Sequence, residues 1–310
     1  MNPAASVVLF TTIAGAAQGL VVALALATLG GIATTAFTAR GLVMAGVMLT
    51  IGLVASFGHL GRKERAWRAV LMWRTSWLSR ECIVLPAFIG WIALWWSMLQ
   101  IGESRAILAL VALVLAAVLW LCTAMIYACL RFIEEWAQPL TLVNFVLIGL
   151  SSGFVLASAL AASAGESELL RASAPAAFVF TVAACLARML SLRRNAELKH
   201  RSTLQSATGI RSPKLVQKSM GMSAGSFNTR EFFHRATPLA YRQIRLAGLL
   251  LLFALPVACM VWALFAARDP AAPAPWLIAV LLQIPGLLAD RWFFFAQARH
   301  PQNLYYQVVS

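Results

Sequence analysis

Long apolar runs constrain this chain more than any other feature of its sequence. Each run has about 20 mainly apolar residues, the length that a helix needs to cross the hydrocarbon core of a bilayer. A helix also satisfies its backbone hydrogen bonds within one segment, as a bilayer requires. The sequence therefore predicts an all-α polytopic membrane protein with eight transmembrane helices, in which residues 1–310 form a single integral membrane domain. The predicted spans are 6–30, 41–60, 82–101, 106–130, 139–162, 174–191, 246–267 and 275–295.

Composition supports a membrane location and argues against nucleic acid as a partner. The chain is 61% hydrophobic and 12% charged, whereas a soluble domain is about 25% charged. A net charge of +14 would indicate nucleic-acid binding in a soluble protein. Here the cations flank apolar spans, where such residues set orientation and contact anionic lipids. We expect membrane lipids, and not nucleic acid, as partners.

The distribution of Lys and Arg predicts the orientation. With eight spans, both termini share one side with the second, fourth and sixth loops, and all but four of the 25 Lys and Arg residues lie on that side. Cytoplasmic loops carry such an excess. We therefore expect both termini in the cytoplasm and the protein in a bacterial inner membrane. Two four-helix halves are possible, although no internal repeat shows them.

Two polar segments lie on the predicted cytoplasmic side. The first, 61–81, is a basic loop. The second, 192–245, is punctuated by Gly, Ser, Thr and Pro, so we expect it to be mostly irregular. A loop of this length is usually functional or disordered, and two interpretations stay open: a docking surface for a soluble partner, or a solvated loop that touches lipid headgroups. The mixture of aromatic and charged residues in "FNTREFFH" favours docking. The candidate docking residues are Arg62, Arg65, Arg230, Glu231 and His234.

The ionisable residues argue against several functions. Acidic residues are absent from the middle of the apolar runs, and only Glu81 and Asp290 lie at run edges. Ion-coupled transporters need ionisable groups at bilayer depth, so a stand-alone transporter is disfavoured. A bis-histidine haem is not expected, because only His59 lies at the edge of a confident span. The cysteines form no C-x-x-C pair, so no iron–sulfur cluster is expected in this chain.

His59 and Glu81 suggest a quinone site. His59 closes the second predicted span and Glu81 opens the third, so both belong at the same membrane face. Reduction of a quinone takes two electrons and two protons, and histidine titrates near neutrality and can donate a proton. Glu81 could orient His59 or pass protons in from water, and Ser76, Trp77 and Arg80 could close the pocket. The alternative is that His59 caps a helix, that Glu81 pairs with Arg80 or with Arg74, and that the tryptophans belong to an aromatic belt.

The stretch "HLGRKERAWRAVLMWRTSWLSRE", residues 59–81, resembles the signature of the membrane-anchor subunits of the dimethyl sulfoxide reductase family. The similar elements are "HLG" at 59–61, "RA" at 68–69 and "SWLSRE" at 76–81. "SVVLFTT", "LQSATGI…GSFNTREFFH" and "DRWFFFAQARHPQNLYY" extend the similarity over essentially the whole chain. The resemblance implies an eight-helix anchor without haem. Such an anchor holds a molybdopterin catalytic subunit and an iron–sulfur electron-transfer subunit and exchanges electrons with a quinone. The family's functional histidine and glutamate correspond to His59 and Glu81.

The predicted orientation indicates which branch of the family the chain resembles. Family members that serve exported reductases hold their partners outside, whereas this signature loop is predicted to lie inside. This arrangement is similar to the sulfite-oxidising branch, whose anchors serve cytoplasmic sulfite dehydrogenases. The expected function is to pass electrons from sulfite oxidation to ubiquinone or menaquinone, with the substrate chemistry on a partner subunit. The alternatives are an anchor of an S- or N-oxide reductase that oxidises quinol, and a purely structural anchor without a quinone site of its own.

Overall fold

The computed structural model describes residues 1–103, 106–219, 232–266 and 272–305, without the side chains of His59 and Ala266. Within these ranges eight helical segments are long and apolar enough to cross a membrane, which confirms the predicted number. The segments are α1 (Ala5–Leu29), α2 (Thr35–Ser56), α3 (Trp77–Gln100), α4 (Ala106–Ala128), α5 (Pro139–Ala164), α6 (Ser167–Ala196), the composite of α9 (Pro238–Leu249), η3 (Leu250–Ala254), α10 (Leu255–Val261) and η4 (Trp262–Ala266), and α11 (Ala274–Ala296).

Several helices continue beyond the apolar runs that predicted them. The helix α6 reaches Ala196, past Arg193 and Arg194, and α9 already begins at Pro238. Arginine favours helix, and cations in the last turn interact favourably with the helix dipole, so a charge ends an apolar run without ending the helix. The polar segment between α6 and α9 is therefore 197–237, and α7 (Leu204–Thr208) lies within it.

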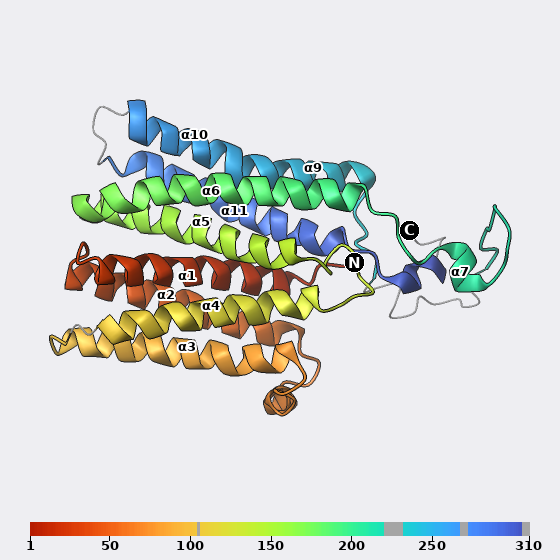
Figure 1. The fold of residues 1–310 in the computed structure, drawn as a ribbon, viewed down its shortest axis with the longest axis horizontal. Coiled ribbons are helices and arrows are strands. Elements are labelled where there is room, and N and C mark those ends of the chain that lie inside the picture. The colour runs from red at the N-terminus through yellow and green to blue at the C-terminus, as the bar shows by residue number, and fades with distance from the viewer. Residues whose placement is uncertain (104–105, 220–231, 267–271, 306–310) are drawn as a thin grey trace.

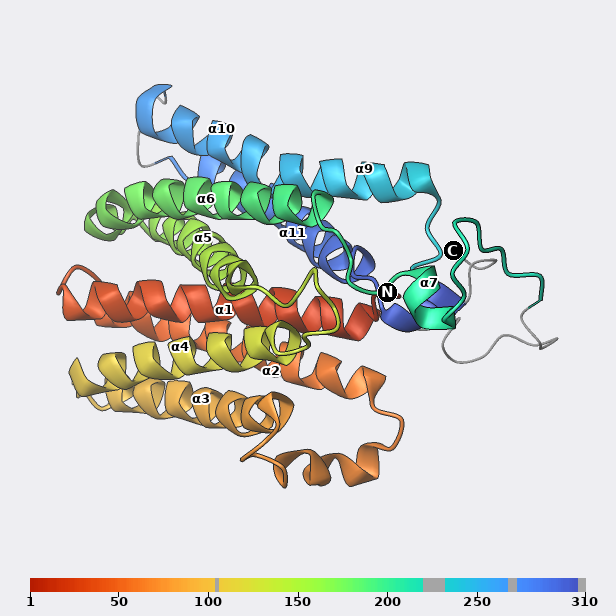
Figure 2. The same cartoon turned by 45° about the vertical axis from the view of Figure 1, so that its right-hand side comes forward.

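The bundle has two halves (Figures 1 and 2). The helices α1 to α4 form one half, and α5, α6, α9 to α10 and α11 form the other, with α1 and α5 side by side at the centre. The N-terminus, η2 (Lys63–Val70), α7 and η5 (Pro301–Tyr305) lie at one end of the bundle, which we call the basic end. The described parts of both polar segments predicted from the sequence therefore lie at the same end.

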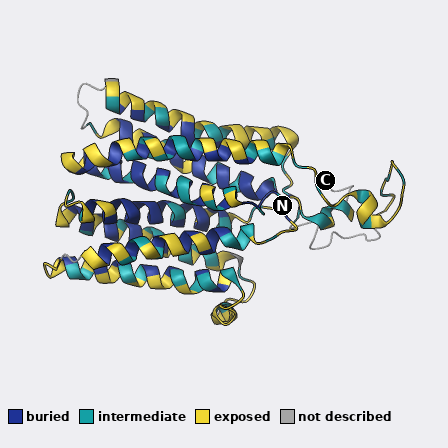
Figure 3. Ribbon diagram, in the orientation of Figure 1, coloured by how far each residue is buried: buried dark blue, intermediate teal, exposed yellow. Residues whose placement is uncertain are grey.

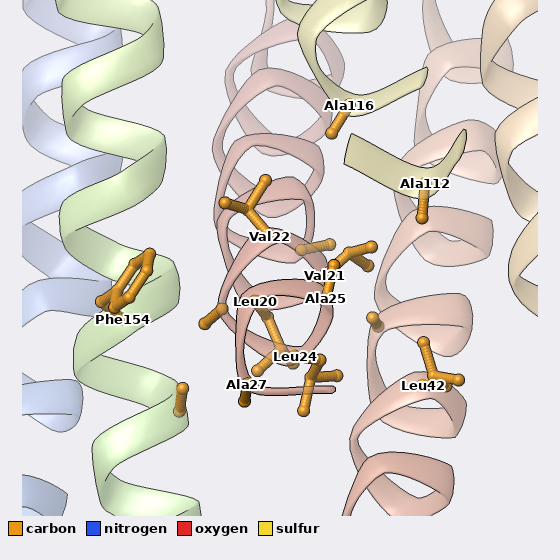
Figure 4. Close-up of a cluster of buried hydrophobic side chains, with 14 of the residues drawn as sticks. Leu20, Val21, Val22, Leu24, Ala25, Ala27, Leu42, Ala112, Ala116 and Phe154 are labelled. Atoms are coloured by element: carbon orange, nitrogen blue, oxygen red, sulfur yellow. The ribbon is translucent and has the colours of Figure 1, made fainter. Parts of the chain in front are cut away.

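The two halves touch through the backbones of α1 and α5. A Cβ atom added to Gly153 would lie 2.0 Å from the carbonyl carbon of Gly19. Small residues allow helices in membranes to approach this closely. Around this contact, Leu20 and Leu24 of α1 lie in one buried cluster with Leu42 of α2 and Phe154 of α5 (Figure 4). The halves are thus joined by a closely packed interface between α1 and α5.

Burial follows from position in the bundle (Figure 3). The most apolar windows of α1 and α5 are 78% buried, whereas that of α3 is 28% buried. The exposed side chains of the outer helices are largely apolar, including Val54, Val114 and Leu281. Lipid is the solvent that suits such a surface, as expected for an integral membrane protein.

Candidate functional site

Glu81 is a buried carboxylate near the basic end. It lies in the second turn of α3 and is 5% exposed. The Thr123 hydroxyl of α4 donates a hydrogen bond to its Oε1 atom. Burying a carboxyl group is costly unless it is hydrogen-bonded or paired, and Thr123 supplies such a bond. Thr123 was not predicted from the sequence, because a threonine inside an apolar run has no distinctive pattern.

Among the described residues Glu81 forms an ion pair with neither Arg80 nor Arg74, the two partners that the alternative interpretation offered. Arg80 instead binds backbone carbonyls of the basic loop. Its Nε atom donates to the carbonyl of Trp73 at 2.9 Å, and its Nη2 atom donates to the carbonyl of Arg74 at 2.8 Å. Its guanidinium lies 4.2 Å from the centroid of the Trp77 ring. The Ser76 hydroxyl caps α3 by accepting from the Ser79 N–H at 3.4 Å. Ser76, Trp77 and Arg80 therefore fix the junction between the basic loop and α3 just before Glu81.

His59 ends the short helix η1 (Phe57–His59), which directly follows α2. The backbone thus places His59 where the basic loop begins. Its side chain lies outside the described part of the structure, so a contact between His59 and Glu81 stays a prediction.

The predicted docking residues are in three different situations. Arg62 and Arg65 are exposed beside η2, together with Trp67 at 62% and Trp73 at 52% exposure. Arg230 and Glu231 lie outside the described residues. His234 is half-buried and stacks on Tyr241 with 5.1 Å between the ring centroids. Its position beside a cavity distinguishes it from the exposed residues of η2.

This cavity has a volume of about 670 Å³ and lies at the basic end. Three of the four histidines line it: His200, His234 and His300. Burial lowers the pKa of His234 and of His300 from their ordinary value. Both imidazoles are thereby biased towards the neutral form, which can accept a proton.

The N-terminal amine of Met1 also lines the cavity. It donates to the carbonyls of Ala298 at 2.8 Å and Ala296 at 3.2 Å. Burial lowers the pKa of this amine to about 5, while the negative charge of Glu135 opposes the shift. The first residue of the chain is thus fastened to the end of α11.

A buried ion pair joins α6 to α11 near the basic end. The Nε atom of Arg188 lies 2.6 Å from Oδ1 of Asp290, with side chains 3% and 8% exposed. Arg291 is also buried, and its guanidinium lies 3.8 Å from the centroid of the Phe145 ring. From the sequence, Arg188 was grouped with the loop cations. Its position inside the predicted span 174–191 was the signal that could have marked it, because a charge within a span is a functional candidate.

Metal binding is a further possibility for clustered ionisable side chains. Within the ranges that the structure describes, no three His, Cys, Asp or Glu side chains converge to hold a metal ion. The expectation that this chain binds neither haem nor an iron–sulfur cluster stays a prediction.

The fold and this polar end define an integral membrane protein with ionisable chemistry concentrated at one end of its helix bundle. The family model of the "DMSO reductase anchor subunit (DmsC)" matches residues 1–297, and the chain belongs to this family. The chain is also 43% identical to a sulfite dehydrogenase subunit of Allochromatium vinosum over 330 aligned residues, with 100% of each chain covered. These findings confirm the resemblance seen in the sequence. The protein is a membrane-anchor subunit of a multi-subunit oxidoreductase, which implies catalytic partner subunits.

Proposed function

We propose that this chain is the quinone-reactive anchor of a molybdopterin and iron–sulfur complex that oxidises sulfite in the bacterial cytoplasm. Electrons leave the iron–sulfur subunit, which docks on the basic end around Arg62 and Arg65, and reduce ubiquinone or menaquinone beside Glu81. The charge distribution supports a cytoplasmic basic end, since most cations are at that end. The similarity to a sulfite dehydrogenase subunit supports the direction of electron flow.

The observation that carries the proposal is the buried carboxylate of Glu81 bonded to Thr123. It lies about 6 Å along α3 from the start of the helix, at a rise of about 1.5 Å per residue. At this depth a quinone can enter from the bilayer while protons arrive from the aqueous side. Reduction to quinol adds two electrons and two protons to the quinone, and a carboxyl group can deliver protons to the headgroup oxygens. Thr123 orients that carboxyl group.

The test compares quinone-coupled sulfite oxidation with reduction of ferricyanide, which accepts electrons without protons. In Glu81→Gln and His59→Ala we expect the quinone-coupled rate to fall by about 10²-fold or more, while ferricyanide reduction is retained. Thr123→Val should show a smaller loss of the same kind. Glu168→Gln is the matched control, because Glu168 is an exposed carboxylate in the first turn of α6, whose start lies at the opposite end of the bundle, and its loss should leave both rates unchanged.

Normal quinone-coupled rates in both Glu81→Gln and His59→Ala would refute the site. That result would favour the purely structural anchor, with quinone held mainly by the iron–sulfur subunit. Co-purification identifies the large subunit independently. A large subunit that reduces an S- or N-oxide, and does not oxidise sulfite, would reverse the proposed direction of electron flow.

A further inference from the structure

A buried carboxylate lies next to one of the histidines that line the cavity at the basic end. The Nε2 atom of His200, which lines the cavity, is 3.8 Å from Oε1 of Glu135. Glu135 is 4% exposed, and its Oε2 atom has no hydrogen-bond partner among the described residues. The sequence alone did not single out Glu135. Its position makes it the first buried acid that a proton entering from the cavity meets.

Tyr241 connects this acid with the buried ion pair. It lines the same cavity, and its ring centroid is 4.8 Å from that of Phe293. The guanidinium of Arg188 lies 6.0 Å from the same Phe293 ring. Tyr241 and Arg188 thus lie against the same ring, and the charge of Glu135 also acts on Tyr241. Arg188 in turn holds Asp290 at 2.6 Å.

Tyr127 of α4 continues the connection towards the other half of the bundle. Its ring centroid is 5.8 Å from that of Phe145, the ring on which the guanidinium of Arg291 lies at 3.8 Å. Arg291 directly follows Asp290 in the sequence. Tyr127 interacts electrostatically with both Arg291 and Glu81. It therefore lies within electrostatic range of Arg291 in one half and of the Glu81 carboxylate in the other.

The last step runs along α4. Thr123 and Tyr127 are four residues apart, so their side chains lie on the same face of the helix. Thr123 donates to Glu81. A series of ionisable and hydroxyl groups, in direct contact with one another at His200–Glu135, Arg188–Asp290 and Thr123–Glu81, thus connects the cavity with the proposed quinone site: His200, Glu135, Tyr241, Arg188, Asp290, Arg291, Tyr127, Thr123 and Glu81.

From this series we infer that the histidine-lined cavity is the entry of a proton path to Glu81, a function that rests on the proposed quinone site. Buried charges are costly, and well-packed apolar side chains often replace a buried ion pair without loss of stability. In the described part of the chain, Arg188 Nη2, Arg291 Nε and Glu135 Oε2 lack hydrogen-bond partners. These buried polar atoms give waters places to bind between the side chains.

The chemistry balances with the electrons of the proposed function. Each quinone takes two electrons from the iron–sulfur subunit and two protons from the cavity. A proton passes from water to His200 and Glu135. It continues through Tyr241, bound waters and Asp290 to Tyr127, Thr123 and Glu81, and ends on a quinone oxygen. The two arginines hold waters and carboxylates in place and release no proton.

The test uses the complete complex in membranes. Tyr127→Phe removes only the hydroxyl and keeps the ring among Trp136, Phe294 and Phe295. Tyr305→Phe is the matched control, since that half-exposed tyrosine donates to the carbonyl of Ala207 at the periphery. We expect Tyr127→Phe to lower the quinone-coupled rate about tenfold or more and to increase its solvent deuterium isotope effect. The quinone KM, the ferricyanide rate and the control should not change.

Glu135→Gln supplies a second variant at the far end of the path and should show the same pattern. Its ferricyanide rate also reports whether the complex has assembled. Wild-type quinone rates and isotope effects in both variants would overturn the path. This failure differs from failure of the quinone site, in which Glu81→Gln and His59→Ala themselves turn over quinone normally.

Discussion

The Arg188–Asp290 pair allows the energetics of this bundle to be tested quantitatively. The change is Asp290→Asn, which keeps the shape of the side chain and removes its charge. It leaves Arg188 and Arg291 buried without the carboxylate that now lies 2.6 Å from Arg188 Nε. Breaking a buried pair in this way costs about 3–5 kcal/mol. We expect a loss of this size in the free energy of unfolding.

The same helix provides a control. Arg193 of α6 and Glu197, which follows the helix, form an ion pair with an N–O distance of 3.1 Å, but their side chains are 79% and 67% exposed. Exposed pairs contribute about 0–1 kcal/mol. Glu197→Gln should therefore have almost no effect, although the two pairs differ little in geometry. The contrast isolates burial as the cause.

Unfolding in mixed micelles with increasing sodium dodecyl sulfate measures both free energies. A double-mutant cycle with Arg188→Met completes the design. Because the second change removes one of the two buried arginine charges that Asp290→Asn leaves without a carboxylate, the double variant should be more stable than Asp290→Asn alone. Equal losses at Asp290 and Glu197, or a double variant no more stable than the single one, would refute the reasoning.

Two further predictions concern packing and pH. Gly153→Ala should destabilise the bundle by about 1–3 kcal/mol or more, since its Cβ atom would lie 2.0 Å from the backbone of Gly19. Gly15→Ala is the control in the same micelle assay, because nothing lies within 4 Å of the new Cβ atom. An equal loss of stability in both variants would contradict the close contact. Burial lowers the pKa of the Met1 amine from 8.0 to about 5, so between pH 5 and 8 the unfolded chain binds more protons than the folded chain. The contribution of the amine to the free energy of unfolding is therefore present above pH 8 and is lost as the pH falls towards 5. Thermal unfolding between pH 5 and 8 should show a shallower slope for the N-terminally acetylated chain, and an identical slope would rule out the amine as a source.

The helical framework was largely predictable from the sequence. Apolar length is a local property, so each span could be found without knowledge of its neighbours, and the structure confirms eight of them. Only the helix ends were displaced, as at Ala196 and Pro238, because helices continue through charged residues where apolar runs stop. The family was also predictable, because its signature is a contiguous stretch at 59–81.

The candidate site was predictable only in part. Glu81 stood out because it opens an apolar run, and in the structure its side chain is buried. The ion pair with Arg80 that the alternative interpretation offered is not formed: Arg80 binds loop carbonyls, and Thr123, 42 positions away, binds Glu81. Neighbours in sequence were the natural candidates, but the packing of α3 on α4 selected a residue from another helix.

The sequence by itself determined the number of spans, the asymmetric distribution of charge and the family of this protein. Only the tertiary structure decided which polar residues meet inside the bundle. Arg188 and Asp290 are 102 positions apart, and Glu135 and His200, which lie beside each other, belong to two different loops. The physical reason is that hydropathy acts on each helix separately, whereas a buried contact depends on the rotation and depth of two helices that pack together.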